Sequence, residues 1–175
     1  MHDVVDIAGD RIVGVVGTFP PTACGLATFT ENVLDSILAA APGWAARVVR
    51  LVDAPESDER TLQWVRGDQG SGQLAAAELD RTDVVLLQHE FGIFGGPDGD
   101  EVLTLLGRLD RPLVSVLHTV LVEPSRSQRR IVDALADRSS RLVVLSASAA
   151  RRLVEVHRIE PDLVAVIPHG AAPIF

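Results

Sequence analysis

Three of the five histidines in this 175-residue chain directly follow apolar, strand-like runs: His89 after residues 84–88, His118 after 113–117 and His169 after 163–168. An imidazole titrates near neutral pH and can donate or accept hydrogen bonds. In an open parallel α/β sheet, the carboxyl ends of the strands face the crevice in which ligands bind. The three rings therefore predict a single functional edge.

A zinc site is the alternative chemistry for the same three rings, because three histidines with an open fourth position form a known catalytic arrangement. The sequence contains no H-x-H or H-x-x-x-H pair. Adjacent strands lie about 4.8 Å apart, so ligands from non-adjacent strands would converge only through inward-folded loops. A zinc hydrolase is therefore the minor alternative, and we expect no metal.

The elements that must position these residues alternate between apolar runs and segments of helical period. The expected strands are Arg11–Gly17, Arg47–Val52, Asp83–Gln88, Leu113–Leu117, Leu142–Leu145 and Leu163–Ile167, and residues 60–67 fit either an edge strand or a helical turn. The expected helices are Leu26–Ala41, Gly72–Leu79, Val102–Leu109, Pro124–Ala136 and Ala147–His157. This order predicts an α/β, Rossmann-like parallel sheet of about seven strands, with helices on both faces.

Composition restricts the possible partners and the compartment. Hydrophobic residues make up 47% and aromatic residues only 4%, which suits an aliphatic core around a buried parallel sheet. The formal charge of −8 argues against nucleic acid as a main partner. The single cysteine excludes an internal disulfide framework, and the acidic start is unlike a secretory signal. We expect a cytoplasmic protein.

A loop rich in proline and glycine, residues 17–25, joins the first strand to the first helix. Its glycines, Gly17 and Gly25, would let backbone N–H groups approach an anion. The loop lacks both nucleotide-binding glycine signatures, so a plain turn is an equal alternative. Cys24 is expected to be a packed thiol rather than a nucleophile, and Thr28 with Glu31 forms a capping-box pattern that would start the helix at Thr28.

Two further segments carry polar residues that could contact a ligand. The segment 88–96 places His89 and Glu90 beside phenylalanines and glycines, which is typical of a substrate-contacting loop. Asp98-Gly99-Asp100 matches a metal-binding D-x-D pattern, although Asp100 as a helix N-cap explains it better. Arg126, Arg129 and Arg130 form a basic patch, which is either a solvated face or a weak contact for an anionic acceptor or membrane surface.

Four segments together resemble the amino-terminal domain of retaining GT-B glycosyltransferases of family 4, particularly the mannosyltransferase-like branch. They are Pro20–Thr30, Gln88–Gly96, Leu117–Thr119 and Val166–Gly170. The resemblance implies a two-domain enzyme that moves a mannose-like sugar, with retention, from a nucleotide-diphosphate sugar to a carbohydrate or lipid-linked acceptor without a metal. It implies that residues 1–175 are the acceptor-side domain.

The resemblance also assigns roles to individual residues. It places Gly17 and Gly25 near the donor phosphates and His118 against the transferred sugar, as the catalytic residue that stabilises an oxocarbenium-like transition state. It assigns the acceptor side of the cleft to a larger set: His89, Glu90, Phe91, Gly92, Thr119, His169 and Gly170.

The sequence departs from the family in one respect. No glutamate has another glutamate eight positions further on, so the E-x7-E motif of the donor-binding domain is absent. We therefore expect that the carboxyl-terminal donor domain lies outside this chain and that the chain alone has no turnover. A non-catalytic sugar- or nucleotide-binding module and an ordinary nucleotide-binding Rossmann enzyme are the alternatives.

Overall fold

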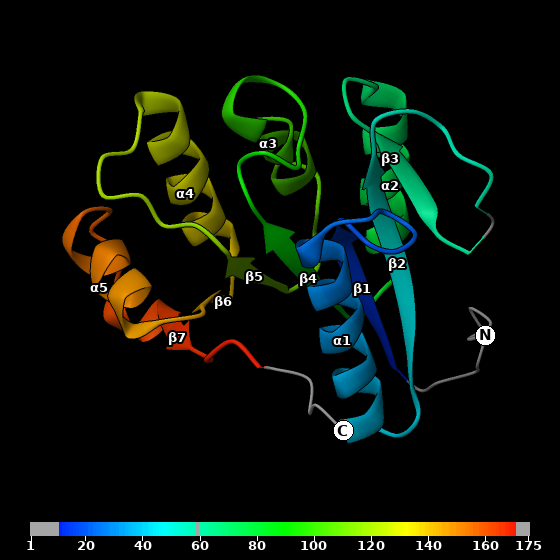
Figure 1. The fold of residues 1–175 in the computed structure, drawn as a ribbon, viewed down its shortest axis with the longest axis horizontal. Coiled ribbons are helices and arrows are strands. Elements are labelled where there is room, and N and C mark those ends of the chain that lie inside the picture. Colours follow the sequence, from blue (N-terminus) through cyan, green and yellow to red (C-terminus); the bar gives the residue numbers. More distant parts are fainter. Residues whose placement is uncertain (1–10, 59, 171–175) are drawn as a thin grey trace.

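The computed structural model describes residues 11–58 and 60–170 of the chain. Seven parallel strands form one sheet in the order β3-β2-β1-β4-β5-β6-β7, which runs across the molecule in Figure 1. The chain moves outward from β1 to β3 and then returns to the middle, so that β4 pairs with the other side of β1. This confirms the predicted parallel α/β sheet and places its topological switch point between β1 and β4.

The strands and helices have the following bounds. The strands are β1 (Arg11–Gly17), β2 (Trp44–Val52), β3 (Leu62–Val65), β4 (Val84–His89), β5 (Leu113–Leu117), β6 (Arg141–Val144) and β7 (Val164–Val166). The α-helices are α1 (Gly25–Ala40), α2 (Gln69–Leu79), α3 (Val102–Leu106), α4 (Arg126–Arg138) and α5 (Ala147–Glu155). Two 3-10 turns, η1 (Pro97–Gly99) and η2 (Pro161–Leu163), complete the elements. The ambiguous segment 60–67 thus contains an edge strand.

Helices cover the two faces of the sheet unequally. On one face, Leu34 of α1 packs with Val15, Val48, Leu86 and Val116. On the other face, buried residues of α2, α3, α4 and α5 pack on alternate strand residues such as Val16, Leu87 and Leu117. Right-handed crossovers require this division, because α1 connects strands in one direction along the sheet and the other helices connect them in the opposite direction.

The structure corrects the expected start or N-cap of four helices. Helix α2 begins at Gln69 rather than Gly72, because the Asp68 carboxylate accepts hydrogen bonds from the first-turn N–H groups and caps it. Helix α1 begins at Gly25 rather than at Leu26 or Thr28, because the Cys24 sulfur accepts a hydrogen bond from the Ala27 N–H and so caps the first turn. Helix α4 begins at Arg126, after Pro124, with a capping box formed by Ser125 and Gln128. Asp100 does not cap α3; its N-cap is Glu101, which makes no capping side-chain bond.

Candidate functional site

The candidate site lies at the carboxyl ends of β1, β4 and β5, beside the switch point. Val16 pairs with Leu87 across β1 and β4, so Gly17, the last residue of β1, lies next to Gln88, the penultimate residue of β4. Gln88 pairs with Val116 across β4 and β5, one step before the end of each strand. Ligands of doubly wound sheets bind at this position because the connecting loops diverge there and leave a crevice.

His118 is held at this edge by two contacts from the end of β4. Its Nε2 lies 2.7 Å from Oε1 of the Gln88 side chain, and its backbone N–H donates to the His89 carbonyl at 3.0 Å. The Gln88 side chain is fully buried and His118 is half-buried. The ring is therefore fixed in orientation at a place that remains partly open.

Phe29 of α1 connects His118 to His169. Its ring centroid lies 5.0 Å from that of His118 in an edge-on arrangement and 4.8 Å from that of His169. His169 and Gly170 are exposed, and the His169 Nδ1 lies 2.8 Å from the Gly170 carbonyl. Two of the three predicted histidines, His118 and His169, are thus gathered at one edge, as expected, by an aromatic residue from α1.

Glu90 and Thr119 form a second pair beside His118. The Thr119 hydroxyl donates to Oε2 of Glu90, and the Phe91 N–H donates to Oε1 of Glu90 at 2.9 Å. These bonds hold the carboxylate next to the strand ends, where it contributes a negative charge. The predicted residues Glu90 and Thr119 therefore lie together with His118.

His118 is a neutral ring at neutral pH. Burial lowers its pKa below the ordinary value of 6.5; the nearby Glu90 carboxylate raises it and the His169 ring lowers it, and the net direction is downward. A neutral imidazole carries one N–H and one acceptor nitrogen. The ring can therefore exchange hydrogen bonds with hydroxyl groups without carrying charge.

His89 does not join this edge, contrary to the expectation that it lines the acceptor side. Its side chain is fully buried; the ring centroid lies 5.0 Å from that of Phe91 and stacks on Phe94 at 6.1 Å. The reason is strand alternation: His89 pairs with Leu117 and shares its face, whereas Gln88 and His118 point to the α1 face. Accordingly, no cluster of three metal-ligating side chains exists among the described residues.

Burial of His89 makes the stability of the fold depend on pH. Desolvation, with a smaller contribution from the charge of His118, lowers the pKa of His89 from 6.5 to about 4. Between these values the unfolded chain binds a proton that the folded chain does not, so stability falls as the pH falls from about 6.5 to about 4. The loss attributable to His89 should reach about 3 kcal/mol.

Urea unfolding at a series of pH values, on the chain and on His89→Leu, measures this loss. Leucine keeps an apolar side chain of similar size between the phenylalanines, so the variant should lose less stability than the parent over this pH window. The carboxylates contribute equally to both proteins, and so does His157, whose pKa is also lowered by burial. Equal slopes in the two proteins would contradict the assignment.

The predicted glycines differ in what surrounds them. A Cβ on Gly17 would lie 2.8 Å from Cβ of Gln88, which is closer than real contacts allow. A Cβ on Gly25, Gly92 or Gly170 would meet no atom within 4 Å. Gly17 is therefore required by close packing, whereas the space around Gly25 at the start of α1 is open. Phe91 is half-buried and packs against the core below this edge.

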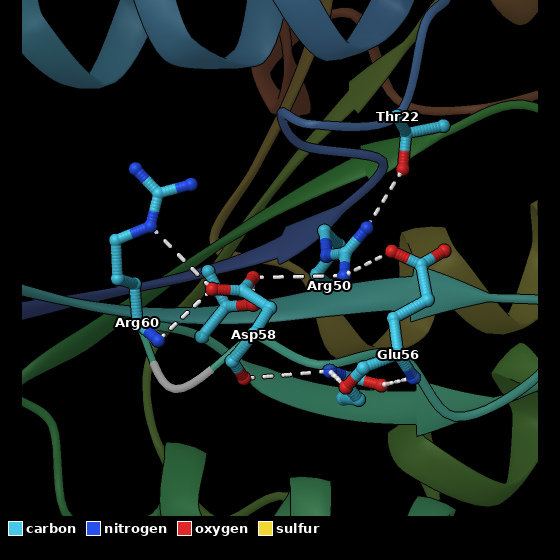
Figure 2. A network of polar contacts seen from close by, with 7 residues as sticks. Thr22, Arg50, Glu56, Asp58 and Arg60 are labelled. Carbon is cyan, nitrogen blue, oxygen red and sulfur yellow. Dashed lines mark hydrogen bonds and ion pairs between the residues drawn. The ribbon is translucent and has the colours of Figure 1, made fainter.

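Arg50 is a central residue of this region that the sequence analysis missed. Its guanidinium is fully buried at the end of β2; Nη1 donates to the Thr22 hydroxyl at 3.2 Å, and Nη2 lies 2.8 Å from Glu56 and 3.5 Å from Asp58. Figure 2 shows the Arg50 guanidinium between the Asp58 and Glu56 carboxylates, with Thr22 above it. An arginine inside an otherwise apolar strand was the available signal, because a buried charge requires partners.

The Asp58 carboxylate is ionised within this network. Burial by itself raises its pKa, but hydrogen bonds from Thr61 and Arg60 and the charge of Arg50 outweigh burial, so the pKa lies below 3.8. The network therefore joins the loop after β1 to the loop after β2 through a buried ion pair. It fixes the glycine-containing loop, residues 17–25, from beneath.

Three other sequence features have structural roles. Cys24 is exposed rather than packed, and its sulfur caps α1. Asp98 accepts hydrogen bonds from Ser125 and Gln128 of the α4 start. In the basic patch, Arg129 donates to the Val156 carbonyl at 2.8 Å and Arg130 lies 3.4 Å from Asp100, so these two side chains bind within the fold.

Comparison of the sequence with protein-family models identifies the family of this domain. The model of Glycosyltransferase Family 4 matches residues 36–173, which is more than half of the chain. The chain belongs to glycosyltransferase family 4. No curated protein matches its sequence significantly. Within residues 11–58 and 60–170, the family 4 domain has no helix with the length and apolar character that crossing a bilayer requires.

Solved structures show the same fold in known transferases. The family 4 domain matches an alpha-glucosyltransferase in complex with UDP (TM-score 0.61, 12% identity, 94% of this chain and 42% of that one). It also matches an alpha-glucosyltransferase with UDP and a 13-mer DNA containing an HMU base (TM-score 0.63, 13% identity, 90% and 42%). A third match is a glycosyltransferase from Rickettsia africae ESF-5 (TM-score 0.56, 14% identity, 90% and 42%).

These matches confirm the predicted fold, that of a single GT-B half. The chain spans 42% of the length of each of the three structures. At 12–14% identity the likeness concerns the fold, and the chemistry of the site rests on the residues described above.

Proposed function

We propose that this domain forms the acceptor-side half of a transferase that moves a mannose-like sugar, with retention, from a nucleotide-diphosphate sugar to a carbohydrate or lipid-linked acceptor. The observation that carries the proposal is the placement of a neutral, oriented His118 beside the switch point of a family 4 fold. In this proposal His118 bonds a hydroxyl of the transferred sugar and stabilises the oxocarbenium-like transition state.

The polar groups beside His118 suit a sugar. Glu90 presents carboxylate oxygens, and a neutral imidazole has one acceptor nitrogen, so both accept hydrogen bonds from hydroxyl groups. Phe29 and the exposed His169 add ring surfaces on the same side. Sugars bind to such mixed surfaces because each ring carries several hydroxyl donors and apolar C–H groups.

The donor phosphates are proposed to lie near the loop 17–25 and the start of α1. The open space at Gly25 leaves the N-terminal end of this 16-residue helix accessible, and helix N-termini attract anions. A second domain is proposed to hold most of the nucleotide, in keeping with the 42% of the transferase structures that this chain spans. Excluding water from the reaction then requires both walls of the cleft.

Saturation-transfer NMR with millimolar ligand tests the proposal on the purified chain, because it detects weak binding. We expect signals on the sugar protons of GDP-mannose or UDP-glucose that exceed those on the matching free nucleotides. The same signals should be lost in His118→Ala and kept in Leu74→Ala, which changes an exposed residue of α2. Preferential binding of NAD would instead support an ordinary Rossmann enzyme.

Turnover provides a separate test of the half-site arrangement. The isolated chain should transfer no sugar from either donor to mannosides, to glycolipids or to water. Measurable transfer by residues 1–175 alone would refute the proposal that a second domain is needed.

A further inference from the structure

Gln88 is a buried polar residue that the proposed function does not yet use. It follows the apolar run 84–87 in β4, and its side chain is fully buried. Its Oε1 contacts His118 Nε2 at 2.7 Å, while its Nε2 has no hydrogen-bond partner among the described residues. An unpaired buried amide group costs about 1–3 kcal/mol, so a leucine would suit the core better. The contact with His118 is what the glutamine provides.

Gly17 makes room for this glutamine. Gly17 lies next to Gln88 across β1 and β4, and any Cβ at position 17 would lie 2.8 Å from the Gln88 Cβ. Glycine in a strand costs about 0.5–1 kcal/mol relative to alanine. Gly17 and Gln88 each lower the stability of the fold at their own position. Both are needed to form the single hydrogen bond between the Gln88 side chain and His118.

The hydrogen bond also selects which ring nitrogen carries the proton. The Gln88 carboxamide oxygen can only accept, so His118 Nε2 must donate, and in the neutral ring Nδ1 is then the acceptor. No described group forms a hydrogen bond to Nδ1, and Nδ1 is not among the fully buried polar atoms without a partner. The acceptor nitrogen is therefore accessible at the edge.

We propose that Gln88 is a positioning residue that holds His118 in its Nε2–H tautomer, that Gly17 is required to admit Gln88, and that the sugar hydroxyl donates to Nδ1. The last part rests on the proposed function, whereas the first two parts concern the ligand-free chain. In many metal and catalytic sites, the partner of one ring nitrogen similarly fixes the tautomer and the direction of the imidazole.

Long-range proton–nitrogen NMR on the chain labelled with ¹⁵N-histidine tests the tautomer at pH 7.5. The His118 signals are assigned by their loss in His118→Asn. We expect the cross-peak pattern of a neutral Nε2–H ring in the parent. In Gln88→Leu the two nitrogen shifts should move toward each other as the tautomers mix, whereas Gln88→Glu should keep the Nε2–H pattern and raise the His118 pKa.

A pair of glycine variants separates the packing role of Gly17 from a general effect of the loop. Gly17→Ala should displace Gln88 and mix the His118 tautomers, whereas Gly25→Ala, with open space around its Cβ, should leave the His118 pattern as in the parent. Circular dichroism and the signals of the other histidines report whether each variant folds. If Gln88→Leu fails to fold, Gln88→Glu and the glycine pair still decide the outcome.

Three results would overturn the positioning role: an Nδ1–H pattern in the parent, an unchanged pattern in folded Gln88→Leu, or equal effects of Gly17→Ala and Gly25→Ala. The sugar part is measured in an active enzyme that contains this domain. There Gln88→Leu should lower kcat roughly tenfold with little change in KM, and Gln88→Glu should recover most of it. If NMR shows the Nε2–H tautomer in the parent but Gln88→Leu leaves kcat unchanged, only the proposed hydrogen bond from the sugar hydroxyl to Nδ1 is refuted.

Discussion

Replacing His118 with alanine in an active enzyme that contains this domain will lower kcat by about 10²–10³-fold, the usual cost of removing one preorganised hydrogen-bonding group from a transition state. The ring is half-buried, neutral and fixed by Gln88, so little reorganisation is needed when the sugar reacts. The prediction depends on a contact that strengthens in the transition state, and KM should therefore change much less than kcat.

Two further variants at this position sharpen the test. His118→Asn keeps a carbonyl oxygen at about the place of Nδ1 and should recover part of kcat. His118→Gln extends its amide toward the place of Nε2, beside Gln88, and should recover less. Steady-state kinetics with saturating donor measure both. A kcat for His118→Ala equal to that of the parent would remove His118 from the chemistry, and equal values for Asn and Gln would contradict the role of Nδ1.

Replacing Arg50 with methionine will destabilise the fold by about 3–5 kcal/mol, because it removes the buried one of the two guanidinium groups that pair with the Asp58 carboxylate and leaves only the exposed Arg60. The side chain of Arg50 is fully buried and that of Asp58 is 6% exposed, so solvent screens this pair little. Glu56 is about half exposed and contributes less. For a chain of this length, such a loss lowers Tm by roughly 10 °C.

Arg47→Met is the matched control, from the same strand. Arg47 pairs with Glu78 at the surface, with 36% of its side chain exposed, so its loss should cost less than about 1 kcal/mol. Thermal and urea unfolding compare the two variants. Hydrogen exchange should also speed up in residues 18–25 in Arg50→Met alone, because Thr22 loses its bond to the guanidinium. Similar losses in both variants would contradict a buried ion pair.

The sequence determined the architecture because the signals for it are local. Apolar runs of strand length alternate with segments of helical period, and this order allows only a few parallel topologies once right-handed crossovers are imposed. The bounds of β1 and β5 agree with the expected ranges. Helix starts were less certain, because several residues near each start can serve as a cap. Cys24 rather than Thr28 caps α1, and the Ser125 cap places Pro124 outside α4 rather than in its first turn.

The side of the sheet that each site residue faces was decided by tertiary structure. His89 and His118 both stand at strand ends, yet their places relative to the β4–β5 pairing send them to opposite faces. His89 enters the core with Phe91 and Phe94, whereas His118 meets Phe29, which α1 supplies from far along the chain. Position along a strand predicts that successive side chains point to opposite faces of the sheet. Only the packing of the helices determines which of these positions is buried and which remains open to a ligand.

The hydrogen-bond partners likewise come from distant segments. Arg50 reaches Thr22 across 28 positions, and Gln88 reaches His118 across 30. Both residues were visible in the sequence as polar side chains in apolar strands, which indicates that each must have a partner but not which one. The sequence by itself therefore determined the sheet and the edge at which chemistry is placed. The tertiary structure decided which side chains meet there, because pairing across strands depends on register and packing rather than on neighbouring residues.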